Sequence, residues 1–350
     1  MPRGLCRLRR HGNWSGMCLY PHRRALGQTV FICERPAGVA SCDSLFATKS
    51  DGSRITARID ELTEGREMMY LSSQNYRKPI EIADPIITIE AGSLEQSQGN
   101  KSTLPQCLPD QELPLSHGYW LNGRWHSLLC LITDWTTRPK LTSCLRNKNL
   151  ILLGDSTTRQ WFLGIHNLLG IEFERTPADR QFNWRRSYRE LNTTLAYTAH
   201  PQLVGSLAVY LDEVRYEVDV LDGLTDPHCN YIVLVSPWAH FSQWTRASYE
   251  ERTQRLRAAL ADFRQRCPAA KVVLKGPHAR DHHSYEAAVY SSDVLLKEIE
   301  KINRRTLYGI GIWYLPVWAM NSAHPAPNTV HMPMDVIREE LKMFFSYVCS

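Results

Sequence analysis

NLILLGDSTTRQWF, residues 149–162, is the stretch that decides the fold of this chain. Its branched aliphatic run ends in a glycine, a pattern that predicts a buried strand of a parallel sheet. Apolar residues then recur at Trp161, Ile165 and Leu169, and this spacing predicts a helix. Ser156 therefore lies at a strand-to-helix turn, where backbone N–H groups lack intrahelical partners and the helix dipole favours negative charge.

Two interpretations of Gly154-Asp155-Ser156 are open. Acyl-transfer enzymes place a nucleophilic serine at such a turn, because the tetrahedral oxyanion needs preorganised donors, here the backbone N–H groups of residues 156 and 157. Gly154 would let the turn close tightly, since it has no Cβ. However, Gly-Asp-Ser arises by chance in about one chain in ten of this length, and Asp-Ser after a strand is an ordinary helix N-cap. Evidence from the rest of the chain is needed to decide between the nucleophile and the helix N-cap.

The composition indicates a globular protein. The chain has 350 residues, 43% hydrophobic and 22% charged, which is enough for one large domain and a smaller one. The net charge of +5 is mild. Its basic clusters lie at residues 7–10, 185–189 and 304–305, and they are not interleaved with aromatic residues as a nucleic-acid groove would be. We therefore expect no nucleic-acid partner.

The cysteines indicate an oxidising compartment. Ten are present, an even number with no Cys-x-x-Cys pair, so we expect disulfides and no metal site. N-glycosylation sequons begin at Asn13, Asn100 and Asn192. No apolar stretch of transmembrane length occurs, and residues 1–12 lack the apolar core of a signal peptide. We expect a secreted or Golgi/ER-lumenal glycoprotein whose native N-terminus is missing.

We divide the chain into two units and a linker. Residues 1–92 are expected to form a β-sandwich with strands at residues 29–33, 53–59 and 86–89, held by disulfides of Cys18, Cys33 and Cys42. Residues 93–103, rich in Ser, Gln and Gly, are the linker. Residues 104–350 form the second unit, which opens with an Asn-Gly hairpin signal at residues 118–125 and with Cys107, Cys130 and Cys144 around it.

Strands and helices are expected to alternate after Ser156, which predicts an α/β domain with a mainly parallel sheet. The ligand of such a sheet lies beyond the carboxyl ends of its strands, so Ser156 and Trp238-Ala239-His240 should share one edge. The expected strands are residues 207–210, 216–220, 231–235, 271–275 and 310–315, and the expected helices are residues 249–266, 286–304 and 334–348.

A nucleophilic serine needs a general base, and His331 is the candidate. It precedes the last expected helix, in Val330-His331-Met332-Pro333, where Pro333 favours a fixed turn. A histidine on a rigid loop beside that helix can accept the serine proton. The alternative is an ordinary histidine on a surface loop.

A series of motifs along the chain points to one family: Gly118-Tyr119-Trp120, Cys130, Cys144-Leu145, residues 154–161, Lys275-Gly276 with Arg280, residues 330–333 and Tyr347-Val348-Cys349. In this order they resemble the C-terminal domain of the NXPE family, whose name stands for neurexophilin and PC-esterase domain. The resemblance implies a three-layer SGNH-hydrolase-like fold of the PC-esterase clan, whose other members move O-acetyl groups on glycans in the secretory pathway. Residues 31–42 resemble the end of a neurexophilin-like β-sandwich, here truncated.

The resemblance carries over unevenly to the candidate site. Ser156 matches the clan's Gly-Asp-Ser serine, and His331 matches the family's His-Pro-Pro histidine. The family also has two carboxylates upstream, which are missing here at Pro316 and Ala319, and loss of an orienting carboxylate costs about ten-thousandfold in serine proteases. An Ala319→Asp change is therefore expected to raise activity. Other candidate orienting or oxyanion residues are Asp155, Thr157, Arg159, His240, Asn328, Asp335 and a carbonyl near Trp318.

Two functions from different classes follow. The first is an O-acyltransferase or esterase that acts on a glycan or sialoglycan hydroxyl, with no bound cofactor and with acetyl-CoA or another acyl donor as substrate. The second is a catalytically weakened secreted glycoprotein that binds a protein ligand through the β-sandwich or the cleft. The intact Ser156 and His331 favour the first, and the missing carboxylates favour the second.

Overall fold

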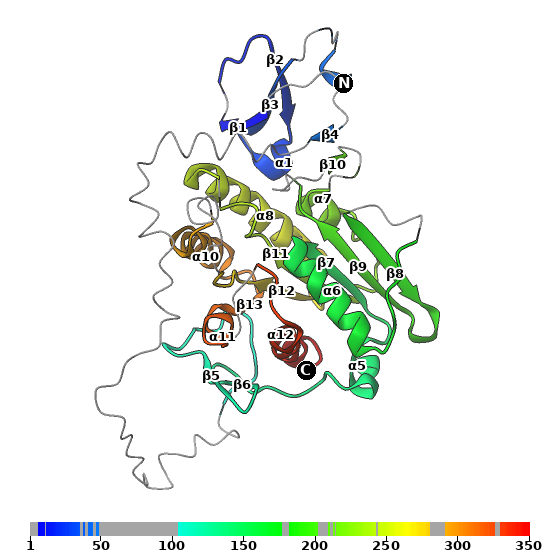
Figure 1. The fold of residues 1–350 in the computed structure, drawn as a ribbon. Helices are drawn as coiled ribbons and strands as arrows, with labels where there is room; N and C mark the ends of the chain where they lie inside the picture. The colour runs from blue at the N-terminus through cyan, green and yellow to red at the C-terminus, as the bar shows by residue number, and fades with distance from the viewer. Residues whose placement is uncertain are drawn as a thin grey trace, which may run out of the picture.

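A six-stranded sheet with strand order β13-β12-β11-β7-β9-β8 organises the larger unit (Figure 1). All neighbouring pairs are parallel except β8 and β9, which are antiparallel. The strands are β7 (Asn149–Gly154), β8 (Asn183–Tyr188), β9 (Thr193–Ala199), β11 (Tyr231–Ser236), β12 (Lys271–Lys275) and β13 (Trp313–Leu315). This computed structural model describes residues 6–10, 12–35, 38, 41–44, 47–48, 104–176, 182–201, 209–210, 213, 215–242, 244–280, 291–325 and 330–350.

Helices cover both faces of this sheet, so the predicted three-layer α/β architecture is confirmed. One face packs against α5, α6 and α12, and the other against α1, α7 and α8. The helix α10 packs beside Trp238 and Phe241, which follow β11. The helices are α1 (Arg23–Leu26), α5 (Arg138–Leu145), α6 (Ser156–Leu168), α7 (Glu217–Asp222), α8 (Arg246–Arg266), α10 (Asp293–Leu307), α11 (Trp318–Ser322) and α12 (Met334–Val348), with short 3-10 turns η1 (Cys42–Ser44) and η4 (Arg189–Leu191).

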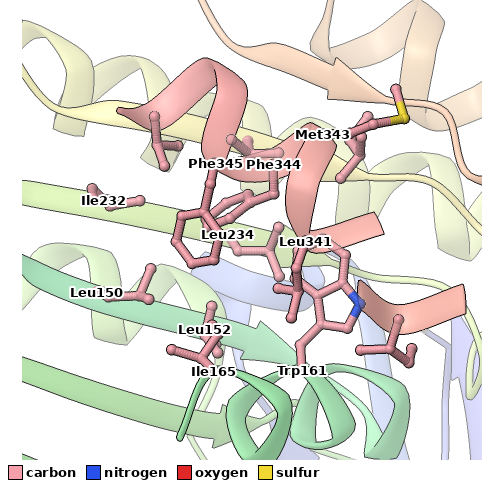
Figure 2. Close-up of a cluster of buried hydrophobic side chains, with 14 of the residues drawn as sticks. Leu150, Leu152, Trp161, Ile165, Ile232, Leu234, Leu341, Met343, Phe344 and Phe345 are labelled. Atoms are coloured by element: carbon pink, nitrogen blue, oxygen red, sulfur yellow. The ribbon is translucent and has the colours of Figure 1, made fainter. Parts of the chain in front are cut away.

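The central strands are apolar on both sides because both faces are covered. Leu150 and Leu152 of β7 point to the α6 and α12 layer, whereas Ile151 and Leu153 point to the α8 layer. Figure 2 shows the first layer, where Trp161 of α6 packs edge-on against Phe344 of α12, with ring centres 5.4 Å apart. Only Asp155 separates the end of β7 at Gly154 from the start of α6 at Ser156, so the helix begins at the carboxyl end of the sheet.

The N-terminal unit is described only in part. Its strands β1 (Cys6–Arg10), β2 (Met17–Pro21) and β3 (Thr29–Glu34) form an antiparallel sheet with β3 in the middle. A further short pair joins β4 (Ala47–Thr48) to β10 (Val209–Tyr210) of the larger unit. The expected sandwich strands at residues 53–59 and 86–89 and the linker at 93–103 lie outside the described residues, so the β-sandwich stays a prediction.

The cysteines are paired, as the sequence predicts. The larger unit holds Cys107–Cys130, Cys144–Cys349 and Cys229–Cys267, and the N-terminal unit holds Cys18–Cys42. Cys33 is also disulfide-bonded, and no described cysteine is free. Of the sequon asparagines, Asn13 and Asn192 are exposed, and Asn100 lies outside the described residues. None of the described helices has the length and apolar character needed to cross a membrane.

The hairpin and most other elements match their predictions. The strands β5 (Gly118–Leu121) and β6 (Arg124–Ser127) pair across Asn122 and Gly123, whose φ angles of 51° and 69° suit the predicted turn. The last helix spans Met334–Val348, as expected. The helix expected at 286–304 is α10, which starts at Asp293 after its cap Ser292, and the helix expected at 249–266 starts earlier, at Arg246.

One predicted strand is wrong. Residues 216–220 were expected to alternate as a strand, but they belong to α7, whose buried residues are Glu217, Val218 and Leu221. Five residues of alternating polarity satisfy either periodicity, so tertiary contacts decide. Glu217 forms an ion pair with Arg252 of α8, with both side chains buried, and this contact needs Glu217 on the inner face of a helix.

Candidate active site

Ser156 and His331 meet at the carboxyl end of the sheet. Ser156 is the first residue of α6, and His331 lies on the loop before α12. Ser156 Oγ and His331 Nε2 are 2.8 Å apart, which is hydrogen-bonding distance. The two residues are 175 positions apart in sequence, and the fold brings them together as a nucleophile and base require.

Asp155 builds the turn that presents Ser156. Its side chain is fully buried, and Oδ1 accepts from Thr157 N at 2.7 Å and from Thr157 Oγ1 at 2.6 Å. Oδ2 accepts from Ala239 N at 3.2 Å. Asp155 is thus the N-cap of α6 and also ties that turn to the segment after β11. The N-cap interpretation of Gly-Asp-Ser is confirmed, and the nucleophile interpretation stays a prediction.

One expected oxyanion donor is corrected by this cap. Residues 156 and 157 were expected to offer their backbone N–H groups to an oxyanion. The N–H of Thr157 donates to the Asp155 carboxylate instead, because it is the N2 donor that an N-cap side chain satisfies. Thr157 therefore has a structural role, and Ser156 N–H is left as the backbone candidate.

The space around the turn explains Gly154. A Cβ at this position would collide with Thr158 Oγ1 and approach Ser236 Cβ to 3.1 Å. Any side chain would therefore push α6 away from the end of β7. The glycine is needed because strand, turn and helix approach closely here.

Two histidines, the buried His200 and the partly buried His240, follow the strands on either side of β7 and extend this edge. His200 follows β9 and His240 follows β11, and His200 Nε2 lies 3.0 Å from His240 Nδ1. The backbone N–H of His200 donates to the backbone carbonyl oxygen of Gly154 at 3.0 Å, which fixes His200 beside the turn. Burial lowers the pKa of both rings, and the Asp155 carboxylate works against this for His240. His240 was predicted for this edge, whereas His200 was not.

Comparison with known sequences identifies the larger unit. Residues 125–349 match the family model described as NXPE family member 4-like, C-terminal domain, and this span is more than half of the chain. The chain belongs to the NXPE family. It is also similar to a solved structure of a GDSL-like lipase from Parabacteroides merdae, with 12% identity and a TM-score of 0.35 over 59% of this chain and 97% of that chain.

The surroundings of His331 in this NXPE chain favour its neutral form. Partial burial lowers the pKa of His331, the charge of Arg159 lowers it further, Asp155 opposes the shift and Arg280 adds to it. Only a neutral imidazole can take the serine proton. The environment therefore keeps His331 in its basic form at pH values where an ordinary histidine begins to protonate.

We expect this shift to appear in the pH profile of any acyl transfer. The acidic limb of kcat/KM should lie below the ordinary histidine pKa of about 6.5. In Arg159→Met, a positive neighbour is lost and the imidazolium becomes easier to form, so the limb should move to higher pH. Arg255→Met, on the exposed side of α8, is the control and should leave the limb in place. A limb that moves to lower pH in Arg159→Met would contradict this electrostatic account.

Two of the candidates for a third residue that orients His331 have other hydrogen-bond partners in the structure. Asp335 lies at the start of α12, where Oδ1 accepts from Val336 N at 2.9 Å and Oδ2 lies 3.3 Å from His324 Nε2. The Trp318 carbonyl accepts from Ser322 Oγ at 2.9 Å. Both thus have other partners. Asn328 lies outside the described residues, so its orienting role stays a prediction.

Ala319, the position of a missing family carboxylate, lies in α11. It lines a groove of about 400 Å³ together with Lys297, Arg304 and Trp318. Lys297 Nζ lies 4.0 Å from the centre of the Trp318 ring. A carboxylate at position 319 would therefore enter a groove that contains two cations and the carboxylate of Glu300, which lies 2.7 Å from Lys297 Nζ.

Two further residues near His331 were not predicted. His278 follows β12, and Gln160 lies one helical turn after Ser156 in α6. The rule that located Ser156 and His240, namely that site residues follow parallel strand ends, would also have selected His278. Within the described residues, no group of His, Cys, Asp and Glu side chains could hold a metal ion.

Proposed function

We propose that this NXPE chain is an acyl-transfer enzyme, an O-acyltransferase or esterase that acts on glycan hydroxyls. The observation that carries the proposal is the 2.8 Å hydrogen bond between Ser156 Oγ and His331 Nε2. His331 takes the serine proton while Oγ attacks the acyl carbonyl, and the proton then passes to the leaving group. A glycan hydroxyl, deprotonated by His331, takes the acyl group in the second step, and water in its place gives hydrolysis.

The oxyanion formed on the acyl oxygen needs donors beside Ser156. We assign this role to Ser156 N–H, at the positive end of the α6 dipole, and to the side chain of His240. His240 suits the role because its Nδ1 is engaged with His200, which leaves Nε2 for a ligand. No bound cofactor is needed for these steps, since the acyl donor, acetyl-CoA or another activated acyl compound, is a substrate.

The charge around the site favours an acidic acceptor. Arg159 lies one turn beyond Ser156, and no described carboxylate is within ion-pairing distance of it. Arg159 and Arg175 each lie 5.7 Å from the Trp184 ring, so two guanidinium groups gather at one aromatic side chain. Arg guanidinium groups bind carboxylates in a bidentate manner. We therefore propose a sialoglycan as the acceptor.

The proposed compartment is the secretory lumen or the cell exterior. Four disulfides are described, and such bonds persist where the environment is oxidising. The exposed Asn13 and Asn192 add two surface positions for N-glycans. This setting agrees with a glycan acceptor, which is found in the same compartment.

Mass spectrometry of the acyl-enzyme tests the proposal. The purified protein is mixed with an activated acetyl ester, and Ser156 is expected to gain one acetyl group. Added sialoglycan should remove this group faster than the same glycan without its sialic acid, because Arg159 binds the carboxylate. Arg159→Met should reduce the difference between the two acceptors. Absence of any acetyl adduct, together with no reaction with a serine-directed fluorophosphonate, would reject the enzyme.

The second candidate is a secreted glycoprotein with weakened catalysis that binds a protein ligand. The observation that favours it is that the family carboxylate positions hold Pro316 and Ala319, while Asp335 is engaged with His324 and its own helix. Without a carboxylate, the imidazolium that forms in the transition state gains less stabilisation. The protein ligand would then bind the N-terminal unit or the cleft, and the acyl-enzyme experiment separates the two candidates.

A further inference from the structure

The backbone on both sides of His331 is held by side chains from two other elements. His278 Nε2, after β12, lies 3.0 Å from the carbonyl oxygen of Val330. Gln160 of α6 donates from Nε2 to the carbonyl oxygen of Met332. The carbonyls that precede and follow His331 in sequence are thus both hydrogen-bonded to side chains, while the imidazole bonds to Ser156.

His278 is a fixed donor in this arrangement. Its ring is 1% exposed and packs edge-on against Trp238, with ring centres 4.6 Å apart. A carbonyl oxygen only accepts, so Nε2 carries the hydrogen and Nδ1 the lone pair. Nδ1 is buried and has no hydrogen-bond partner among the residues the structure describes. Burial, followed by the charge of Lys275, lowers the pKa of His278 well below its ordinary value, so the ring stays neutral.

Gln160 connects the base to the helix of the nucleophile. Ser156 and Gln160 are four residues apart in α6 and therefore lie on the same face of the helix. One rigid element thus carries both the serine and a donor to the loop of His331. The buried side chain of Met332, 2% exposed, holds the same loop in the core.

We infer that His278 and Gln160 are positioning residues, which hold the backbone of residues 330–332 so that His331 Nε2 faces Ser156 Oγ. They supply part of the orientation that a carboxylate supplies in a Ser-His-Asp triad, acting on the backbone of the histidine instead of its ring. A misplacement of about 1 Å in such a pair can cost about a hundredfold in rate. This inference rests on the proposed function and names residues that serve it.

Matched variants separate positioning from stability. His278→Phe keeps a ring against Trp238 and loses the donor, and His278→Gln keeps an N–H donor. His166→Phe is the control, because His166 is also 1% exposed and its Nδ1 bonds a backbone carbonyl, Phe162 O, at 2.8 Å. Gln160→Glu is the second test, since a carboxylate of the same shape cannot donate to Met332 O.

With the activated acetyl ester, His278→Phe and Gln160→Glu are expected to lower kcat by about tenfold or more and to leave KM within about twofold, because orientation is lost and binding is not. His278→Gln should recover most of kcat, and His166→Phe should keep kcat per folded molecule. If His278→Phe does not fold, Gln160→Glu decides. Equal kcat values for Gln160→Glu, His278→Phe and the control would overturn the inference.

Hydrogen exchange tests the inference independently of activity. The peptide that spans residues 330–337 should exchange faster in His278→Phe than in His166→Phe, because the loop has lost a bond. If the wild type reacts with neither the ester nor the fluorophosphonate, the proposed function fails. The exchange measurement still tests whether His278 holds the loop that carries His331. Equal exchange in the two variants would then overturn the positioning role.

Discussion

Ser156→Ala is expected to abolish measurable acetyl release, with a loss of about a thousandfold or more relative to the wild type. The reason is that His331, 2.8 Å away, would have no nucleophile to deprotonate. His331→Ala should lose at least about a hundredfold, which is the lower end of what a general base contributes. Because the two residues act as one unit, the double variant should be no worse than Ser156→Ala alone. Release of acetate or an acetylated acceptor is the measurement.

Ser187→Ala is the matched control for this experiment. Ser187 is an exposed serine of β8 whose Oγ lies 3.2 Å from Thr194 Oγ1. Its loss removes a similar hydroxyl in the same sheet and should leave acetyl release unchanged. If Ser156→Ala retains the activity of Ser187→Ala, then Ser156 is only a helix residue, and the binding function becomes the better description.

Glu340→Leu is expected to lower the free energy of unfolding by about 3–5 kcal/mol, the cost of leaving a buried charge without its partner. Glu340 is 0% exposed and lies 3.8 Å from Nζ of Lys275, which is 1% exposed. Its two oxygens also accept from Trp161 Nε1 at 2.6 Å and Asn321 Nδ2 at 2.8 Å. Urea unfolding followed by tryptophan fluorescence gives the free energy.

Two further variants show whether the charge is the cause. Lys275→Met in the Glu340→Leu background should recover at least half of the loss, because no charge is then buried alone, although two N–H donors lack an acceptor. Glu298→Leu removes a carboxylate from the exposed pair with Lys301 and should change the free energy by less than about 0.5 kcal/mol. No recovery in the double variant would assign the loss to packing or to the two donors.

The sequence predicted the elements that have a long apolar pattern or a glycine or proline at their boundary. The strand that ends at Gly154 and the helix that starts at Ser156 were predicted from one apolar run and one glycine. The helix Met334–Val348 was predicted to the residue, because Pro333 marks its start. The strand predicted at residues 216–220 was wrong, since these residues belong to α7 and the ion pair of Glu217 with the buried Arg252 of α8 is not visible in the sequence.

The sequence was sufficient to predict the pair of Ser156 and His331, but not the contacts that surround the pair. Ser156 and His331 were selected by motif, and the rule of strand ends placed His240 beside them. That Thr157 N–H is taken by Asp155, or that His278 holds Val330, depends on distances that no sequence pattern contains. The same limit applies to Ala319, whose neighbours Lys297 and Arg304 come from another helix. The effect expected of Ala319→Asp therefore depends on these cations as well as on His331.

The disulfide between Cys144 and Cys349 has a consequence for the order in which the protein is made. During synthesis Cys144 leaves the ribosome 205 residues before its partner, while Cys130 follows Cys107 after only 23. At about 5–20 residues per second, Cys144 waits for roughly ten seconds or more beside earlier cysteines. The bond that joins α5 to the end of α12 is therefore formed late, and any disulfide that Cys144 forms earlier with another cysteine has to be exchanged before the native bond can close.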